Sequence, residues 1–169
     1  PKKVVFADGE DENMLKAAIA FKNSKLGIPI LIGKEKLIKD QIKKIGYSEN
    51  FDIEIVNSKD TLKRERYVKY LFKRLQREQG MLEWDCDRLV KNDRGIWASC
   101  MVACRDADAM VTGNTRRYSS SLEKISKVVD SRPGEIMFGL NLVVNRGKTI
   151  FICDTSVIEY PDAAQLADM

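Results

Sequence analysis

Short apolar runs alternate with amphipathic stretches over the first 56 residues, and this alternation constrains the fold more than any other feature. The runs at 4–7, 28–32 and 53–56 have the length of buried strands. Apolar residues recur at helical spacing between them: Leu15, Ala18, Ile19, Ile38, Ile42 and Ile45. Strands that alternate with helices over short connections predict an α/β fold, with a parallel sheet covered by helices on both faces.

The next stretch reads as a group of helices followed by a strand. The spacing of Tyr67, Leu71 and Leu75 predicts one buried helix face, and a second helix is predicted over 82–91. We expect Asp93 to be the N-cap of a third helix, because its carboxylate can accept the free N–H groups of a first turn. Residues 109–112 then predict a further strand.

The pattern of the chain changes near Pro133. A helix after 114–121 is expected to end at 132–134, and antiparallel strands are predicted at 136–144 and 149–154 around a turn. This change from strand–helix units to a β-hairpin predicts a first α/β lobe over 1–133 and the start of a second, truncated lobe over 134–169.

Composition narrows the class of protein. The net charge of +4 is mild, so it does not require nucleic acid, and no run of about 18 apolar residues exists to form a membrane span. Hydrophobic residues make up 44% of the chain, which is typical of a folded domain. From Pro1 and Met169 we expect a piece excised from a longer chain, and the lack of a leader peptide favours a cytoplasmic protein.

The sequence has no histidine, which excludes a Cys/His zinc site and a Ser/His/Asp triad. Cys100 and Cys104 are four apart and share a helix face, whereas Cys86 and Cys153 lack paired spacing. We therefore expect reduced, buried thiols rather than a metal site, and we predict no catalytic residue and no cofactor within these residues.

The strongest candidate for a ligand site is the stretch 110–122. It runs from a strand through a glycine turn and two arginines into a helix that begins with serines. Helix N-termini present free N–H groups, and guanidinium groups bind phosphate, so an anion is the expected ligand. The alternative is that Ser119 or Ser120 caps the helix and the arginines are merely solvated. The candidate ligand-binding residues are Thr112, Gly113, Arg116, Arg117, Ser119 and Ser121.

Two further charged segments have a functional and a structural interpretation. The acidic segment 8–11 follows a strand and could hold a metal or move protons, but we favour capping of the next helix. The basic stretch 59–79 has interleaved tyrosines, as in some nucleic-acid binders, but we favour a solvated helix face.

Several segments together resemble the phosphate acetyl/butyryltransferase family, in order along the whole chain. These are 5–11, 15–18, 29–33, 107–113, 131–134 and 151–155. The amino-acid sequence at 6–11 and 112–118 is more similar to the C-terminal regulatory part of bacterial hybrid NADP-dependent malic enzymes than to free-standing transferases.

The resemblance implies a two-lobed architecture like that of isocitrate and isopropylmalate dehydrogenases, usually dimeric, with a coenzyme A thioester site between the lobes. It also implies that NADP and a divalent metal serve the malic-enzyme catalytic region of the parent chain. Acetyl-CoA is then the expected ligand of this part, and neither nucleic acid nor a membrane is an expected partner.

Two positions depart from the pattern of active transferases. Glu123 stands where these enzymes carry an arginine after the loop, and Gln76 stands where they carry one near the end of the long helix. Loss of cations that neutralise phosphate and a developing oxyanion weakens transfer chemistry. We therefore expect an acetyl-CoA-sensing regulatory and oligomerisation domain; the alternatives are an active phosphate acetyltransferase and a nucleic-acid-binding module.

Overall fold

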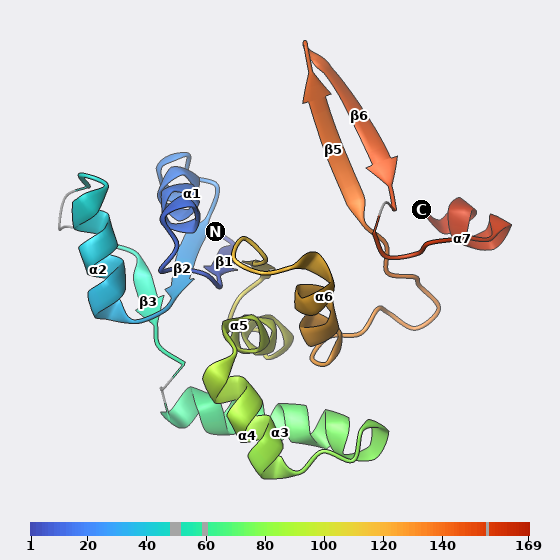
Figure 1. Cartoon of the computed structure of the whole chain (residues 1–169), viewed down its shortest axis with the longest axis horizontal. Helices are drawn as coiled ribbons and strands as arrows, with labels where there is room; N and C mark the ends of the chain where they lie inside the picture. The colour runs from blue at the N-terminus through green and yellow to red at the C-terminus, as the bar shows by residue number, and fades with distance from the viewer. Residues whose placement is uncertain (48–51, 59–60, 155) are drawn as a thin grey trace. The chain divides into compact units, whose positions relative to one another are not determined.

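The computed structural model describes residues 1–47, 52–58, 61–154 and 156–169. The chain divides into two compact units, Pro1–Val129 and Asp130–Met169 (Figure 1). The break in contacts therefore falls before Pro133, and the interpretation of the second unit as the start of a second lobe stays a prediction.

The first unit is built on a parallel sheet in the strand order β3-β2-β1-β4. Its strands are β1 (Lys3–Phe6), β2 (Ile28–Ile32), β3 (Glu54–Val56) and β4 (Ala109–Val111). Val5 of β1 is in register with Ile30 on one side and Met110 on the other, so β1 lies inside the sheet. The predicted parallel sheet is confirmed, and it sets β1 and β4 side by side with their carboxyl ends at the same edge.

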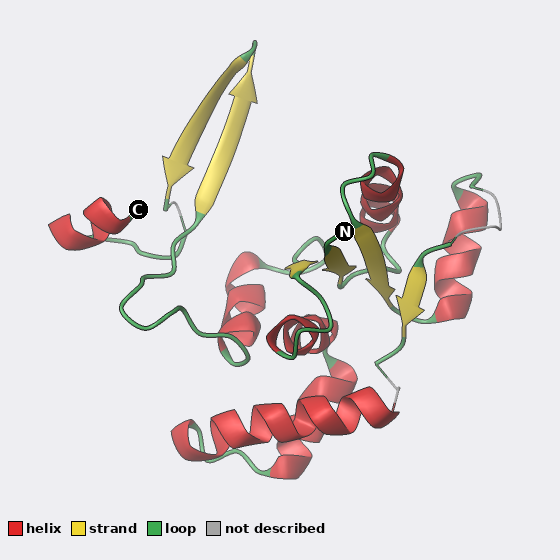
Figure 2. Ribbon diagram, turned by 180° about the vertical axis from the view of Figure 1, so that it is seen from behind, coloured by secondary structure: helices red, strands yellow, loops and turns green. Residues whose placement is uncertain are grey.

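Helices cover both faces of this sheet (Figure 2). One buried cluster joins Phe6 and Leu31 to α1 (Glu12–Asn23) and α2 (Glu35–Lys44). The other joins Val5, Ile30 and Ile32 to three further helices. Those helices are α3 (Thr61–Glu78), α4 (Glu83–Asn92) and α5 (Arg94–Ala103). Because neighbouring strand residues point to opposite faces, β1 and β2 each contribute to both clusters, and the α/β fold class is confirmed.

Helix α5 is the most deeply buried of these helices, with every residue from Ile96 to Met101 buried. The ring of Trp97 meets that of Tyr67 edge to face, with centroids 5.0 Å apart. Tyr67, Leu71 and Leu75 form the buried face of α3 that the sequence predicts. Packing on all sides fixes α5, and its N-terminus therefore offers a rigid position for a functional side chain.

The second unit contains a hairpin of β5 (Leu140–Asn145) and β6 (Lys148–Cys153), followed by α7 (Ala163–Asp168). The prediction that the first of these strands begins at 136 is wrong, because pairing starts only where Leu140 meets Cys153. Cys153 is exposed, contrary to the expectation of buried thiols, although Cys86 and Cys100 are buried and all four thiols are free. No helix among the described residues is long and apolar enough to cross a bilayer.

Candidate functional site

The predicted ligand stretch follows β4, directly beside the loop that follows β1. We call residues 112–117 the phosphate loop, after the ligand that the sequence predicts. Gly113 has a φ of +101°, a conformation that disfavours a side chain. The loop then leads into α6 (Tyr118–Ser126). The predicted turn between strand and helix is therefore present at the carboxyl edge of the sheet, where open α/β sheets bind ligands.

Two side chains of the phosphate loop are tied to carboxylates in the loop after β1. Asn114 Nδ2 donates to Asp11 Oδ1 at 2.7 Å, and Thr115 Oγ1 donates to Asp8 Oδ1 at 3.0 Å. Asp8 is buried, and its second oxygen has no partner among the described residues. These contacts hold the loops after β1 and β4 together.

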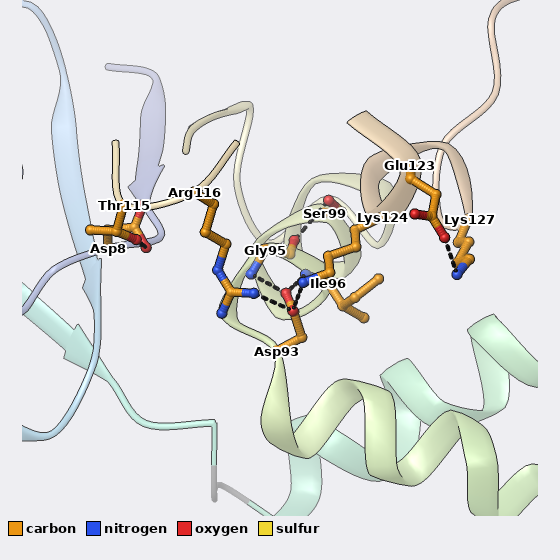
Figure 3. A network of polar contacts seen from close by, with 10 residues as sticks. All are labelled: Asp8, Asp93, Gly95, Ile96, Ser99, Thr115, Arg116, Glu123, Lys124 and Lys127. Carbon is orange, nitrogen blue, oxygen red and sulfur yellow. Dashed lines mark hydrogen bonds and ion pairs between the residues drawn. The ribbon is translucent and has the colours of Figure 1, made fainter. Parts of the chain in front are cut away.

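The next side chain of the loop, Arg116, is paired with Asp93 (Figure 3). Its Nη1 lies 3.1 Å from Asp93 Oδ2, and Lys124 Nζ of α6 lies 2.6 Å from the same oxygen. The other oxygen of Asp93 accepts the N–H groups of Gly95 and Ile96 at 2.9 and 3.1 Å. Asp93 is therefore the N-cap of α5, as the sequence predicts, and it also links this helix to the phosphate loop and to α6.

The surroundings of Asp93 favour its charged form. Burial by itself raises the pKa of this carboxyl, but the hydrogen bonds from Lys124 and from the Ile96 N–H, together with the charge of Arg116, outweigh it. The resulting pKa lies below the ordinary value of 3.8. The carboxylate is thus ionised at neutral pH and attracts both cations.

The other predicted ligand residues lie around the start of α6. Arg117 is its N-cap residue and makes no side-chain capping hydrogen bond, so neither Ser119 nor Ser120 occupies the cap position. Arg117 and Ser119 are exposed. The hydroxyl of Ser121 is buried and has no hydrogen-bond partner among the described residues. It lies close to Gly113, since a Cβ added to that glycine would be 3.8 Å from the hydroxyl oxygen. Arg117, Ser119 and the uncapped start of α6 are therefore accessible to solvent, whereas the Ser121 hydroxyl is not, and binding of a ligand by these residues stays a prediction.

Structural roles account for the acidic segment after β1. Asp11 caps α1 by accepting the Met14 N–H at 3.0 Å, as expected. Glu10 accepts the Lys34 N–H at 2.8 Å and forms a 2.6 Å ion pair with Arg94. Within the ranges that the structure describes, no three carboxylate or thiol groups come together as metal ligands.

Several arginines of the basic helix α3 pair with groups on other elements of the first unit. Arg74 donates to the carbonyl oxygens of Lys127 and Ser126 at the end of α6. Arg64 and Arg66 form ion pairs with Asp87 and Asp106, both at 3.0 Å. Three other basic side chains, Lys69, Lys73 and Arg77, are exposed, as the predicted solvated helix face requires.

Sequence reasoning did not identify Lys124 as part of the site. Lys124 and Asp93 are 31 residues apart in the sequence, so their contact depends on how α5 packs against α6. A lysine one helical turn or less from a run of serines carries no signal that would reveal this contact. The neighbouring Glu123 is exposed and pairs at 2.9 Å with Lys127, the C-cap residue of the same helix.

Comparisons with known proteins agree with this architecture. The model of the family described as phosphate acetyl/butaryl transferase matches residues 1–169. A probable NADP-dependent malic enzyme of Rickettsia prowazekii is 41% identical over 99% of this chain, which spans 22% of that protein. An NADP-dependent malic enzyme of Rhizobium meliloti is 39% identical over 100% of this chain, again 22% of its own length.

Among solved structures, the EutD phosphotransacetylase from Staphylococcus aureus superimposes with a TM-score of 0.83. The match covers 99% of this chain and 50% of that protein, at 21% sequence identity, and therefore shows a shared fold alone. The present chain thus spans about a fifth of the length of the malic enzymes and half that of the solved phosphotransacetylase. Because the family model covers its whole length, the chain belongs to the phosphate acetyl/butaryl transferase family.

Proposed function

We propose that this chain is the phosphate-acetyltransferase-like domain of an NADP-dependent malic enzyme and that it senses acetyl-CoA. The observation that carries the first part is the identity of 41% and 39% to two such enzymes over essentially the whole chain. In this proposal the catalytic region of the same chain performs the oxidative decarboxylation of malate to pyruvate. NADP and a divalent metal belong to that region, and the cytoplasmic parent protein is a homo-oligomer.

The chemistry of the phosphate loop supports an anionic coenzyme as the ligand. Arg116 and Arg117 offer guanidinium groups, which bind phosphate oxygens through paired hydrogen bonds. The turn at Thr112 and Gly113 and the hydroxyl groups of Ser119 and Ser121 add neutral donors. Coenzyme A carries several phosphate groups, and the start of α6 favours negative charge.

The charges around Glu123 favour sensing over acetyl transfer. Glu123 occupies a position at which the resemblance leads us to expect an arginine in active transferases, and its ion pair with Lys127 leaves no net positive charge there. Gln76 likewise replaces an expected cation on α3 with a neutral, exposed side chain. A site without these cations stabilises a developing oxyanion poorly, although it can still bind the coenzyme.

The experiment that tests the proposal is a titration of the full-length enzyme with acetyl-CoA while malate-dependent reduction of NADP is followed. We expect the rate to fall to a plateau as acetyl-CoA saturates its site. The variant Arg117→Ala should shift the titration to higher acetyl-CoA, because it removes a phosphate contact without touching the Asp93 pair. A rate that stays constant at saturating acetyl-CoA contradicts the sensing role.

The shared fold with a phosphotransacetylase favours one competing function, active acetyl transfer. This alternative predicts that the full-length protein forms acetyl-CoA from acetyl phosphate and CoA. The charge at Glu123 predicts the opposite, and replacing Glu123 with arginine should then raise any residual rate. Efficient transfer by the unmodified protein would establish the competing function.

A further inference from the structure

Asp93 serves two sets of donors with its two oxygens (Figure 3). Oδ1 accepts the amides that begin α5, whereas Oδ2 accepts both Arg116 Nη1, at 3.1 Å, and Lys124 Nζ, at 2.6 Å. One carboxylate oxygen therefore has two cationic partners. One of these cations, Arg116, belongs to the phosphate loop that is proposed to bind the coenzyme.

The three side chains differ in their access to solvent. The Asp93 side chain is only 11% exposed and that of Lys124 is 25% exposed, whereas that of Arg116 is 41% exposed. Lys124 also makes the shorter contact. Arg116 is therefore the partner that can turn toward a ligand, while Lys124 stays with the carboxylate.

We propose that Arg116 exchanges between two anionic partners, the Asp93 carboxylate and a phosphate of the bound coenzyme, and that Lys124 keeps Asp93 paired when the guanidinium leaves. This inference rests on the proposed coenzyme-binding function and adds a regulatory contact to it. Removing one partner of a buried ion pair is costly because the other charge is left uncompensated. A second cation on the same oxygen removes that cost, so the exchange becomes feasible.

The exchange makes Asp93 a competitor of the ligand. Asp93→Asn keeps the N-cap, because asparagine caps helices as well as aspartate does, but it removes the charge that holds Arg116. Acetyl-CoA should then bind more tightly, by about fivefold, the worth of one partly exposed ion pair. If Asp93 only held the loop in shape, the same substitution would weaken binding.

Lys124→Met has the opposite expected effect. Without the ammonium group, departure of Arg116 leaves the Asp93 carboxylate unpaired, so acetyl-CoA should bind more weakly, by about fivefold or more. In the Asp93→Asn background, Lys124→Met should no longer weaken acetyl-CoA binding, because residue 93 then has no charge that could be left unpaired. A direct contact of Lys124 with the ligand would instead weaken binding in both backgrounds.

The test is calorimetric titration of the full-length protein with acetyl-CoA, for the unmodified form, the two single variants and the double variant, with thermal unfolding as a check on folding. Tighter binding by Asp93→Asn and a Lys124→Met penalty that vanishes in the double variant support the exchange. Unmodified protein that binds while Asp93→Asn binds equally or more weakly overturns the exchange but leaves the proposed function intact. No binding by the unmodified protein overturns both. If Asp93→Asn fails to fold, Asp93→Ser replaces it in both the single and the double variant, because serine also caps helices and carries no charge.

Discussion

At the scale of single residues, Asp93 shows which contacts a sequence reveals. Its role as the N-cap of α5 follows from an acidic residue placed just before a run of helical apolar residues, and the structure confirms it. Its ion pairs with Arg116 and Lys124 span 23 and 31 residues and depend on the packing of α5 against α6. The arginines and serines of the ligand stretch were therefore recognisable, but the carboxylate that restrains one of them was not.

The cap and the charge of Asp93 can be separated by two substitutions. Asp93→Ala should lower the free energy of unfolding more than Asp93→Asn does, by about 1 kcal/mol, because only alanine leaves the Gly95 and Ile96 N–H groups without an acceptor. Urea unfolding of both variants measures the difference. Equal losses would show that the cap contributes nothing to stability.

The charge of Asp93 also predicts a pH dependence. Its pKa is lowered in the folded state, so its contribution to stability is present above the ordinary value of 3.8 and is lost as the pH falls through the folded pKa. The stability difference between the unmodified protein and Asp93→Asn should therefore be constant near neutral pH and shrink below pH 3.8. Urea unfolding at a series of pH values across this range measures the stability difference. A difference that grows on acidification would contradict the prediction.

At the scale of elements, strands buried on both faces were the easiest to predict. The apolar runs at β1, β2 and β3 have no other interpretation between helical stretches, and all three appear in the structure. The hairpin was placed less well, because residues 136–139 are as apolar as β5 but have no strand opposite them. Pairing partners, rather than local pattern, decide where such a strand begins.

The hairpin turn yields a prediction for this element. Arg146 and Gly147 both have positive φ, +46° and +76°, as a two-residue turn between twisted strands requires. Gly147→Ala should destabilise the hairpin by about 1 kcal/mol, because alanine resists this backbone conformation. Arg146→Gly, the matched control, should be neutral or stabilising. Hydrogen exchange of the β5 and β6 amides compares them, and equal protection in both variants would contradict the turn assignment.

At the scale of the whole chain, the buried apolar residues are concentrated in the first unit. Every core residue found in the described ranges, from Val5 to Val128, precedes residue 130. The end of this unit is tied down by Tyr70 and Arg74, which donate to the carbonyl oxygens of Val128 and Lys127. The first unit thus contains the sheet, both core clusters and the phosphate loop.

This distribution predicts that residues 1–129 fold without the second unit. A chain truncated after Val129 should unfold cooperatively on heating, because it retains the whole of the core described above. Residues 130–169 alone should show no cooperative transition, since an isolated hairpin is marginal in water. Calorimetry of both pieces tests this, and a gradual transition of the longer piece would show that its core needs the second unit.

The central claim is that the phosphate loop binds acetyl-CoA, and direct titration of Arg116→Ala in the full-length protein tests it most directly. Arg105→Gly is the matched control, because this exposed arginine follows α5 at the end opposite Asp93 and its φ of +62° suits glycine. We predict that Arg116→Ala weakens acetyl-CoA binding about tenfold or more, the worth of a charged hydrogen bond, while Arg105→Gly leaves it unchanged. Equal affinity in both variants and the unmodified protein would contradict the account.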